Sequence, residues 1–219
     1  MKIAVSKFLA LALGAAALIA ISASVASAQT TDVYKLNYFS DNYAVTIDNV
    51  PVFGADAAIR IDNPGLTYGN LCAMIYVFDQ DQQMTECCGC LETHNGLQTL
   101  SLIHNLTTNP LTGIVSNSGV IKVVSAAVNN SPCDPTSNVT PTKNLRAWAT
   151  HIASQEIVIT ETPTATPPVS YKISNVTITE TEFTDSPLGA SELTNLQSQC
   201  SFIGILGSGK GICSCGGGG

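Results

Sequence analysis

Cysteine is the residue that most constrains how this chain can fold. The sequence has eight cysteines, and five of them lie in two short clusters, "ECCGC" at residues 86–90 and "CSC" at residues 213–215. An even number of cysteines in an exported chain predicts a framework of disulfides. The predicted disulfide residues are Cys72, Cys87, Cys88, Cys90, Cys133, Cys200, Cys213 and Cys215.

The first residues predict that the chain is exported. Two lysines precede an apolar stretch from Phe8 to Ile21, and the small-residue triplet Ala26-Ser27-Ala28 follows it. This order is that of a secretory signal peptide, and the apolar stretch is shorter than the roughly 20 residues of a spanning helix. We therefore expect a signal peptide at residues 1–28 and a mature chain at 29–219. The mature chain should be secreted, periplasmic or on the cell surface, with no membrane insertion after signal cleavage.

Removal of this leader makes the chain more acidic. The leader holds two of the nine basic residues and none of the sixteen acidic ones, so the net charge moves from -7 to about -9. This balance argues against a nucleic-acid partner, because a polyanion needs a basic patch and the remaining lysines and arginines are scattered singly. The mature chain is long enough to form one domain with its own core.

Backbone geometry limits how the cysteines can pair. Adjacent Cys87 and Cys88 are too close for an ordinary bridge to each other. If "ECCGC" is extended, Cys88 and Cys90 share one face of a strand and Cys87 points to the other. The same alternation places Cys213 and Cys215 together. We predict that the first cluster is tied to the C-terminal cluster, which fastens the tail to the body.

The paired cysteines also allow an alternative, a thiolate metal site. Cys88, Cys90, Cys213 and Cys215 would give four sulfurs to a tetrahedral zinc or a soft copper ion. Structural zinc sites usually separate paired cysteines by two to four residues, whereas one residue separates each pair here. The nearest histidine, His94, lies four residues after Cys90. Disulfides are therefore the predicted state, with no metal and no cofactor.

Two other motifs are weaker. "GILGSGKG" at residues 204–211 matches the start of a nucleotide-binding loop, but Gly211 stands where the magnesium-binding serine or threonine belongs. We interpret its glycines as a turn that lets the tail reach its bridge partners. Asp79, Asp81 and Glu86 offer oxygens for calcium, yet acidic residues in turns are usually only solvated.

The sequence further predicts that the protein is not an enzyme. His94, His104 and His151 have no marked nucleophile or acid beside them, and the common hydrolase and metalloprotease motifs are absent. Alternation places His151 on the same strand face as Ala147 and Ala149, where a structural role is favoured. A hydrolase with a dispersed site remains an alternative, because catalytic triads are defined by geometry.

Most of the mature chain has the pattern of short β-strands. Alternation or β-branched residues mark the strands, and turns rich in Gly, Pro, Asn and Asp separate them. The predicted strands are Val33–Tyr38, Tyr43–Val50, Ala57–Ile61, Leu71–Phe78, Leu97–Ile103, Val120–Ser125, Leu145–Ile152, Glu156–Thr162 and Ser170–Phe183. This pattern predicts an all-β fold, an antiparallel β-sandwich of the immunoglobulin-like or jelly-roll-like type. A Thr/Pro-rich segment near residues 160–168 is interpreted as a long surface loop within a single domain.

One short helix is predicted near the C-terminus, over Ala190–Ile203. Its apolar face is formed at helical spacing by Leu193, Leu196, Cys200 and Ile203. Ser186 and Pro187 have the residue types that begin helices. Because the apolar face should lie on the sheet, Cys200 is expected to point inward toward a bridge partner.

Two stretches carry a resemblance to known proteins. "LCAMIYVFDQDQQMTECCGC", and "SELTNLQSQCSFI" followed by "GICSCG", are similar to segments of exported, cysteine-containing bacterial β proteins that have no assigned activity. The resemblance implies secretion, and it brings no active-site residue to this chain.

Together these observations favour a secreted structural or adhesive β protein. Low charge, many Thr, Ser and Asn residues and covalent cross-links suit such a module, whose partner is a protein or a surface, itself included. Self-assembly would proceed by strand addition at a sheet edge, with the N-terminal segment Val33–Tyr38 as the candidate. Thiolate metal binding and hydrolysis are the two alternatives.

Overall fold

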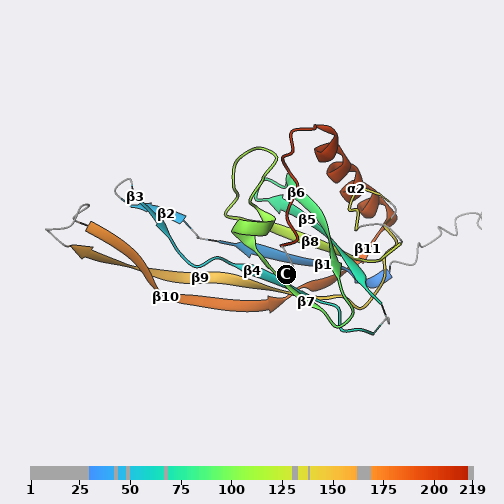
Figure 1. Cartoon of the computed structure of the whole chain (residues 1–219), viewed down its shortest axis with the longest axis horizontal. Helices are drawn as coiled ribbons and strands as arrows, with labels where there is room; N and C mark the ends of the chain where they lie inside the picture. Colours follow the sequence, from blue (N-terminus) through green and yellow to red (C-terminus); the bar gives the residue numbers. More distant parts are fainter. Residues whose placement is uncertain are drawn as a thin grey trace, which may run out of the picture.

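The computed structural model describes residues 30–41, 44–47, 50–66, 69–129, 133–137, 139–161 and 169–216. The predicted signal peptide at residues 1–28 lies outside the described residues. The described part of the chain is made mostly of β-strands, with one short α-helix near its C-terminal end (Figure 1). The predicted all-β class is therefore confirmed. Within these residues no helix is both long and apolar enough to cross a membrane.

Two antiparallel sheets build the fold. The first has five strands in the order β11-β1-β8-β5-β6. These strands are β1 (Thr30–Ser40), β5 (Leu71–Asp79), β6 (Met84–Glu92), β8 (Ser118–Ala127) and β11 (Thr184–Leu188). The second has four strands in the order β10-β9-β4-β7. These strands are β4 (Ala58–Asp62), β7 (Leu97–Ser101), β9 (Arg146–Glu161) and β10 (Val169–Glu182). A separate hairpin pairs β2 (Ala44–Ile47) with β3 (Val50–Phe53).

The main core lies between the two sheets. Ile75 and Ile121 of the five-stranded sheet belong to the same buried cluster as Ile59 and Leu100 of the four-stranded sheet. All four side chains are almost completely removed from solvent. This face-to-face burial is sandwich packing, as the strand pattern predicted.

Strand β5 is buried on both faces, although antiparallel strands commonly have one face in water. One face joins the core between the sheets through Leu71, Ala73, Ile75 and Val77. The other face joins a second buried cluster through Cys72, Met74, Tyr76 and Phe78. A third layer on this side explains why the strand reads as a continuous apolar run.

The third layer contains the C-terminal helix α2 (Ala190–Ile205). Its buried residues Leu196, Cys200 and Ile203 are those that the helical spacing predicted, so this prediction is confirmed. The helix begins at Ala190 as predicted, but Ser186 and Pro187 are not its start signals. Ser186 lies in β11, where it pairs with Tyr34 of β1, and the helix begins after Gly189 without a side-chain cap.

Several strand boundaries also differ from the prediction. The two strands predicted over Leu145–Ile152 and Glu156–Thr162 are replaced by one strand, β9, from Arg146 to Glu161, and Thr162 lies outside the described residues. Within the predicted strand Tyr43–Val50, the described residues belong to two strands, Ala44–Ile47 to β2 and Val50 to β3. Strand β7 ends at Ser101, and one turn of π-helix over Leu102–Leu106 follows it. There the Asn105 side chain accepts a hydrogen bond from the Ser101 amide at 2.8 Å, which replaces continued strand pairing.

Candidate functional site

The tail that follows α2 crosses the side of the sandwich. Gly207, Gly209 and Gly211 have positive φ angles, a conformation that side chains disfavour. A Cβ at Gly211 would collide with the side chain of Ile203 and lie 3.3 Å from the Thr85 carbonyl oxygen. The predicted turn is thus confirmed. The segment follows a helix instead of a strand, so it lacks the setting of a nucleotide-binding loop.

The tail runs beside β6 and aligns the two cysteine clusters. The Cys87 amide donates to the Gly211 carbonyl at 2.9 Å, and the Cys213 amide donates to the Cys87 carbonyl at 3.3 Å. These bonds form a parallel bridge between Cys87 and Ile212. Because the two segments are parallel and extended, Cys88 lies beside Cys213, and Cys90, two positions further along, lies beside Cys215.

All eight cysteines form disulfides. Cys88 bridges Cys213 and Cys90 bridges Cys215, with Cα–Cα distances of 5.2 and 5.3 Å. The predicted link between the two clusters is confirmed. Cys87, which points to the opposite face of β6, bridges the inward-facing Cys200 of α2. The remaining bridge joins Cys72 to Cys133, a pairing that the sequence left open.

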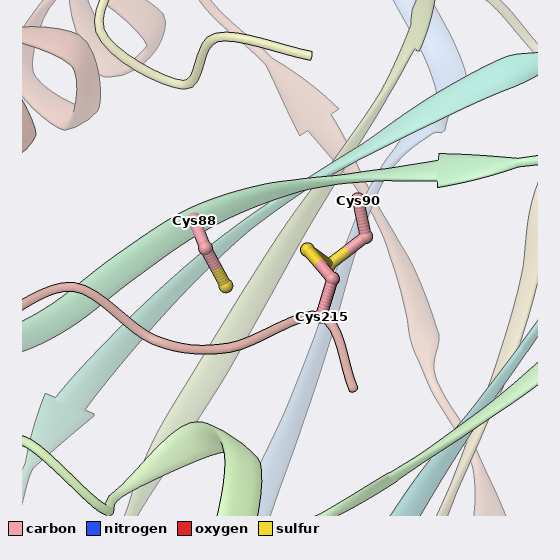
Figure 2. Close-up of side chains that lie close together, drawn as sticks. All are labelled: Cys88, Cys90 and Cys215. Carbon is pink, nitrogen blue, oxygen red and sulfur yellow. A yellow bond between two sulfur atoms is a disulfide. The ribbon is translucent and has the colours of Figure 1, made fainter. Parts of the chain in front are cut away.

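The sulfurs proposed for the metal alternative are close together. The Sγ atoms of Cys88, Cys90 and Cys215 all lie within 4.8 Å of one another, and Figure 2 shows the three side chains pointing toward a common region. Each of these sulfurs is bonded to another sulfur in this structure. A thiolate centre would need both bridges to be reduced first, because the thiolate is the metal ligand.

The tail also contacts the four-stranded sheet. The Gln98 side chain of β7 donates to the Cys215 carbonyl, and the Ser214 amide donates to the Asn105 carbonyl at 2.8 Å. Strands β6 and β7 are each the last strand of their sheet. The tail therefore joins the two sheets on this side, covalently to one and by hydrogen bonds to the other.

The carboxylates considered for calcium are not brought together. Asp79 accepts hydrogen bonds from the amides of Asp81 and Gln83 at 2.9 Å, within the β5–β6 turn. Glu86 is buried and accepts a hydrogen bond from the Asn109 amide at 2.8 Å. Burial raises the pKa of Glu86 to about 7. Its environment is that of a structural carboxyl, not of a calcium loop.

The three histidines have different surroundings. His151 is buried, as its strand position suggested, and its Nε2 lies 2.7 Å from the Thr181 hydroxyl. Its ring stacks on Tyr38 at 4.1 Å between centroids, and burial lowers its pKa. His94 and His104 are exposed.

A polar cleft of about 490 Å³ lies near the start of β9, with Asp32, Lys35, Arg146, Glu182 and Asp185 among its lining residues. No histidine lines this cleft. This cleft therefore does not combine a histidine with a carboxylate and a hydroxyl, the set that a hydrolase site would need.

A long two-stranded ribbon is the most prominent feature that the sequence did not predict. Strand β4 pairs with β9 only from Arg146 to Ala149, whereas β10 continues to pair with β9 as far as Glu161. We call residues 150–161 and 169–180 the β9–β10 ribbon. Figure 1 shows it extending away from the two sheets and α2.

No protein family, no curated protein and no solved structure matches the chain.

The ribbon exposes three large apolar side chains. Val158, Ile159 and Ile178 are 41%, 58% and 54% exposed. Strand β10 is also the last strand of its sheet, so along its outer side the described residues supply no neighbouring strand. Hairpin β2–β3 approaches β10 but pairs only within itself.

The sequence contained a signal for the ribbon. The Thr/Pro-rich segment is flanked on both sides by stretches rich in Thr, Ile and Val. Such a pattern is typical of a hairpin whose two strands pair with each other. The prediction instead divided the first flank into two strands and treated the segment as a loop on the body. Residues 162–168 themselves lie outside the described part of the chain.

Proposed function

We propose that the protein is an exported structural or adhesive β protein that assembles through the outer edge of β10. The observation that carries this proposal is the β9–β10 ribbon, a long strand pair with exposed apolar side chains and a terminal strand. A two-stranded hairpin alone is only marginally stable in water, and a third strand would stabilise it. The ribbon is therefore suited to gaining a strand from a partner.

The edge proposed here differs from the segment that the sequence suggested. Val33–Tyr38, the first candidate, lies in β1 between β8 and β11. Its central residues Tyr34–Leu36 pair with β8 on one side and with β11 on the other, so this part of β1 is not an exposed edge. Strand β10 has 14 residues and an outer side that ends its sheet. Natural proteins usually protect such edges, because they accept strands from other chains.

Export is part of the same proposal. Four disulfides are typical of proteins that fold in an oxidising compartment. The leader pattern supplies the route, with cleavage expected after Ala28. N-terminal sequencing of protein recovered outside the cytoplasm should begin at Gln29. Recovery of full-length protein with free thiols from the cytoplasm would contradict this part.

Shortening the ribbon tests the assembly. Residues 153–177 are replaced by an Asn-Gly turn, which joins Ile152 directly to Ile178 across a tight hairpin. The wild-type mature chain should sediment faster as its concentration rises, and the shortened chain should remain a monomer. The shortened chain should keep its four disulfides, because none of the cysteines lies in the ribbon. Equal association of the two chains would refute the proposal.

The metal alternative has an independent test. The clustering of Cys88, Cys90 and Cys215 sulfurs is the observation in its favour. Elemental analysis and a free-thiol count on protein purified without chelator separate the two states. We expect no titratable thiol in the folded protein. Bound metal together with about four titratable thiols would favour the thiolate centre instead.

A further inference from the structure

We infer that the two tail bridges form a thiol–disulfide exchange centre, which an external thiol opens at Cys215. The reagent is a small thiol, such as glutathione or free cysteine, or an exposed thiol of another protein. The centre consists of Cys88, Cys90, Cys213 and Cys215. It is independent of the edge assembly proposed above.

Access decides which sulfur of the centre an external thiol reaches. Cys215 is partly exposed, whereas its partner Cys90 is completely buried. Cys88 and Cys213 are only 7% and 5% exposed. Thiol–disulfide exchange depends on access as well as on the attacking thiolate. The external thiolate therefore bonds to the Cys215 Sγ, the Cys90–Cys215 bond breaks, and Cys90 leaves as a thiolate.

The freed Cys90 sulfur has a second disulfide close by. Its Sγ lies within 4.8 Å of the Cys88 Sγ, and both side chains project from the same face of β6 (Figure 2). Attack of the Cys90 thiolate on Cys88 forms a Cys88–Cys90 bond, and Cys213 leaves as a thiolate. Two positions along a strand separate Cα atoms by about 6.6 Å, which is within the range that disulfides span.

A last exchange regenerates the external thiol. The Cys213 thiolate attacks Cys215, a Cys213–Cys215 bond forms, and the external thiolate leaves. Residues 213–216 belong to no helix or strand, so the tail can bend to bring these sulfurs together. Two disulfides are present before and after the exchange. The external thiol is therefore a catalyst, and there is no net oxidation or reduction.

The other two bridges lack this arrangement. Cys87 and Cys200 are 0% and 1% exposed, so their bridge is closed to an external thiol. Cys133 is partly exposed, but among the described residues no third sulfur lies as close to its bridge with Cys72 as Cys88 lies to the Cys90–Cys215 bridge. A freed Cys72 thiolate would attack the mixed disulfide and restore the original bond.

The exchange removes the covalent link between the tail and the body. The new bonds lie within β6 and within the tail, so backbone hydrogen bonds to Cys87, Asn105 and Asn109 must hold the tail alone. The Cys87–Cys200 bridge still keeps α2 in place. The native pairing should remain the major form in the isolated protein, because it supports these hydrogen bonds. A partner that binds the released tail or the uncovered edge of β6 would shift the population.

Peptide mapping under non-reducing conditions tests the exchange. The folded mature protein is incubated without oxygen with substoichiometric reduced glutathione, and acid then stops the reaction by protonating thiolates. Digests of the treated protein should contain Cys88–Cys90 and Cys213–Cys215 bridges that are absent from the untreated protein. The other two bridges should be unchanged.

Two paired variants are matched controls, since each keeps one tail bridge. Cys90→Ala/Cys215→Ala lacks the exposed entry point, so its Cys88–Cys213 bridge should open at least about tenfold more slowly than in wild type. Cys88→Ala/Cys213→Ala keeps the entry point but lacks the second disulfide. Its only new species should be the mixed disulfide of glutathione with Cys215.

Three results would each overturn the inference. The first is the absence of both new bridges from glutathione-treated wild type. The second is a mixed disulfide at Cys88, Cys90 or Cys213 before any at Cys215. The third is opening of the Cys88–Cys213 bridge at the same rate in wild type and in Cys90→Ala/Cys215→Ala. None of these results bears on the assembly through β10, which ribbon shortening tests separately.

Discussion

The two bridges that fasten the tail should each contribute much less stability than their sequence separations suggest. Cys88–Cys213 and Cys90–Cys215 both have a sequence separation of 125. Taken singly, a loop of that length corresponds to about 5 kcal/mol of stability. The bridges lie side by side, however, so each closes only a short loop when the other is present.

The magnitudes follow from the shortest closed loop in each case. With one tail bridge intact, the other closes a loop of about six residues, which corresponds to about 2 kcal/mol. When both tail bridges are removed, the Cys87–Cys200 bridge still holds the helix. The first tail bridge then closes a loop of about 15 residues, which corresponds to about 3 kcal/mol. Loss of both should therefore cost about 5 kcal/mol, not about 10.

The Cys72–Cys133 bridge has the shortest sequence separation, yet it should contribute more stability than either tail bridge. Cys72–Cys133 has a separation of 61, and no other bridge shortens its loop. It should contribute about 4 kcal/mol. The order of the effects is thus the reverse of the order in sequence separation.

Urea unfolding of paired alanine variants measures these values. The variants are Cys88→Ala/Cys213→Ala, Cys90→Ala/Cys215→Ala, both pairs together, and Cys72→Ala/Cys133→Ala as the matched control. Each variant that lacks one bridge loses the same two sulfur atoms. Differences between these variants in the free energy of unfolding therefore report the entropy of closing each loop. If either tail bridge alone costs as much as the control bridge, the shared-loop reasoning is refuted.

Two further predictions concern buried groups. Burial raises the pKa of Glu86 and of Glu92 to about 7, above the ordinary value of 4.5, so the native state binds more protons than the unfolded state between these pH values. The free energy of unfolding should therefore fall as pH rises from about 4.5 to 7, by up to about 3 kcal/mol for each group. In Glu92→Gln, the part of this fall that comes from Glu92 should be lost. Urea unfolding of both proteins at pH 5 and pH 8 measures the difference. A rise in stability over this range would contradict the assignment. Gly211→Ala should destabilise by at least about 2 kcal/mol, whereas Gly209→Ala, which has a similar φ and nothing within 4 Å of its Cβ, should cost about 1 kcal/mol. Equal losses in thermal unfolding would show that the Ile203 contact is unimportant.

Local patterns predicted much of the fold. Alternation correctly separated Cys87 from Cys88 and Cys90, because the direction of a side chain in a strand depends only on its parity. Helical spacing identified the buried face of α2 for a similar reason. The partners of Cys72 and Cys133 could not be found in this way, because their contact depends on how distant strands are arranged.

The ribbon and the edge strand were also beyond local patterns. An interior strand such as β1 and a terminal strand such as β10 both have the local pattern of a strand, and their difference lies in what pairs beside them. The length of β9 that projects beyond its pairing with β4 depends on where β4 begins, at Ala58, which β9 itself does not encode. Strand order must be known before a sequence can show which edge is open.

The order of the cysteines has a consequence for biosynthesis. In the export proposed above, Cys72 would emerge with Cys87, Cys88 and Cys90 before its native partner Cys133 has appeared. Oxidation in order of emergence would therefore trap wrong pairs, since a thiol joins whichever accessible sulfur it reaches first. Efficient maturation should require a catalyst that reshuffles bonds in addition to one that makes them. Cells deprived of that isomerase should accumulate mispaired protein even when their oxidising capacity is intact.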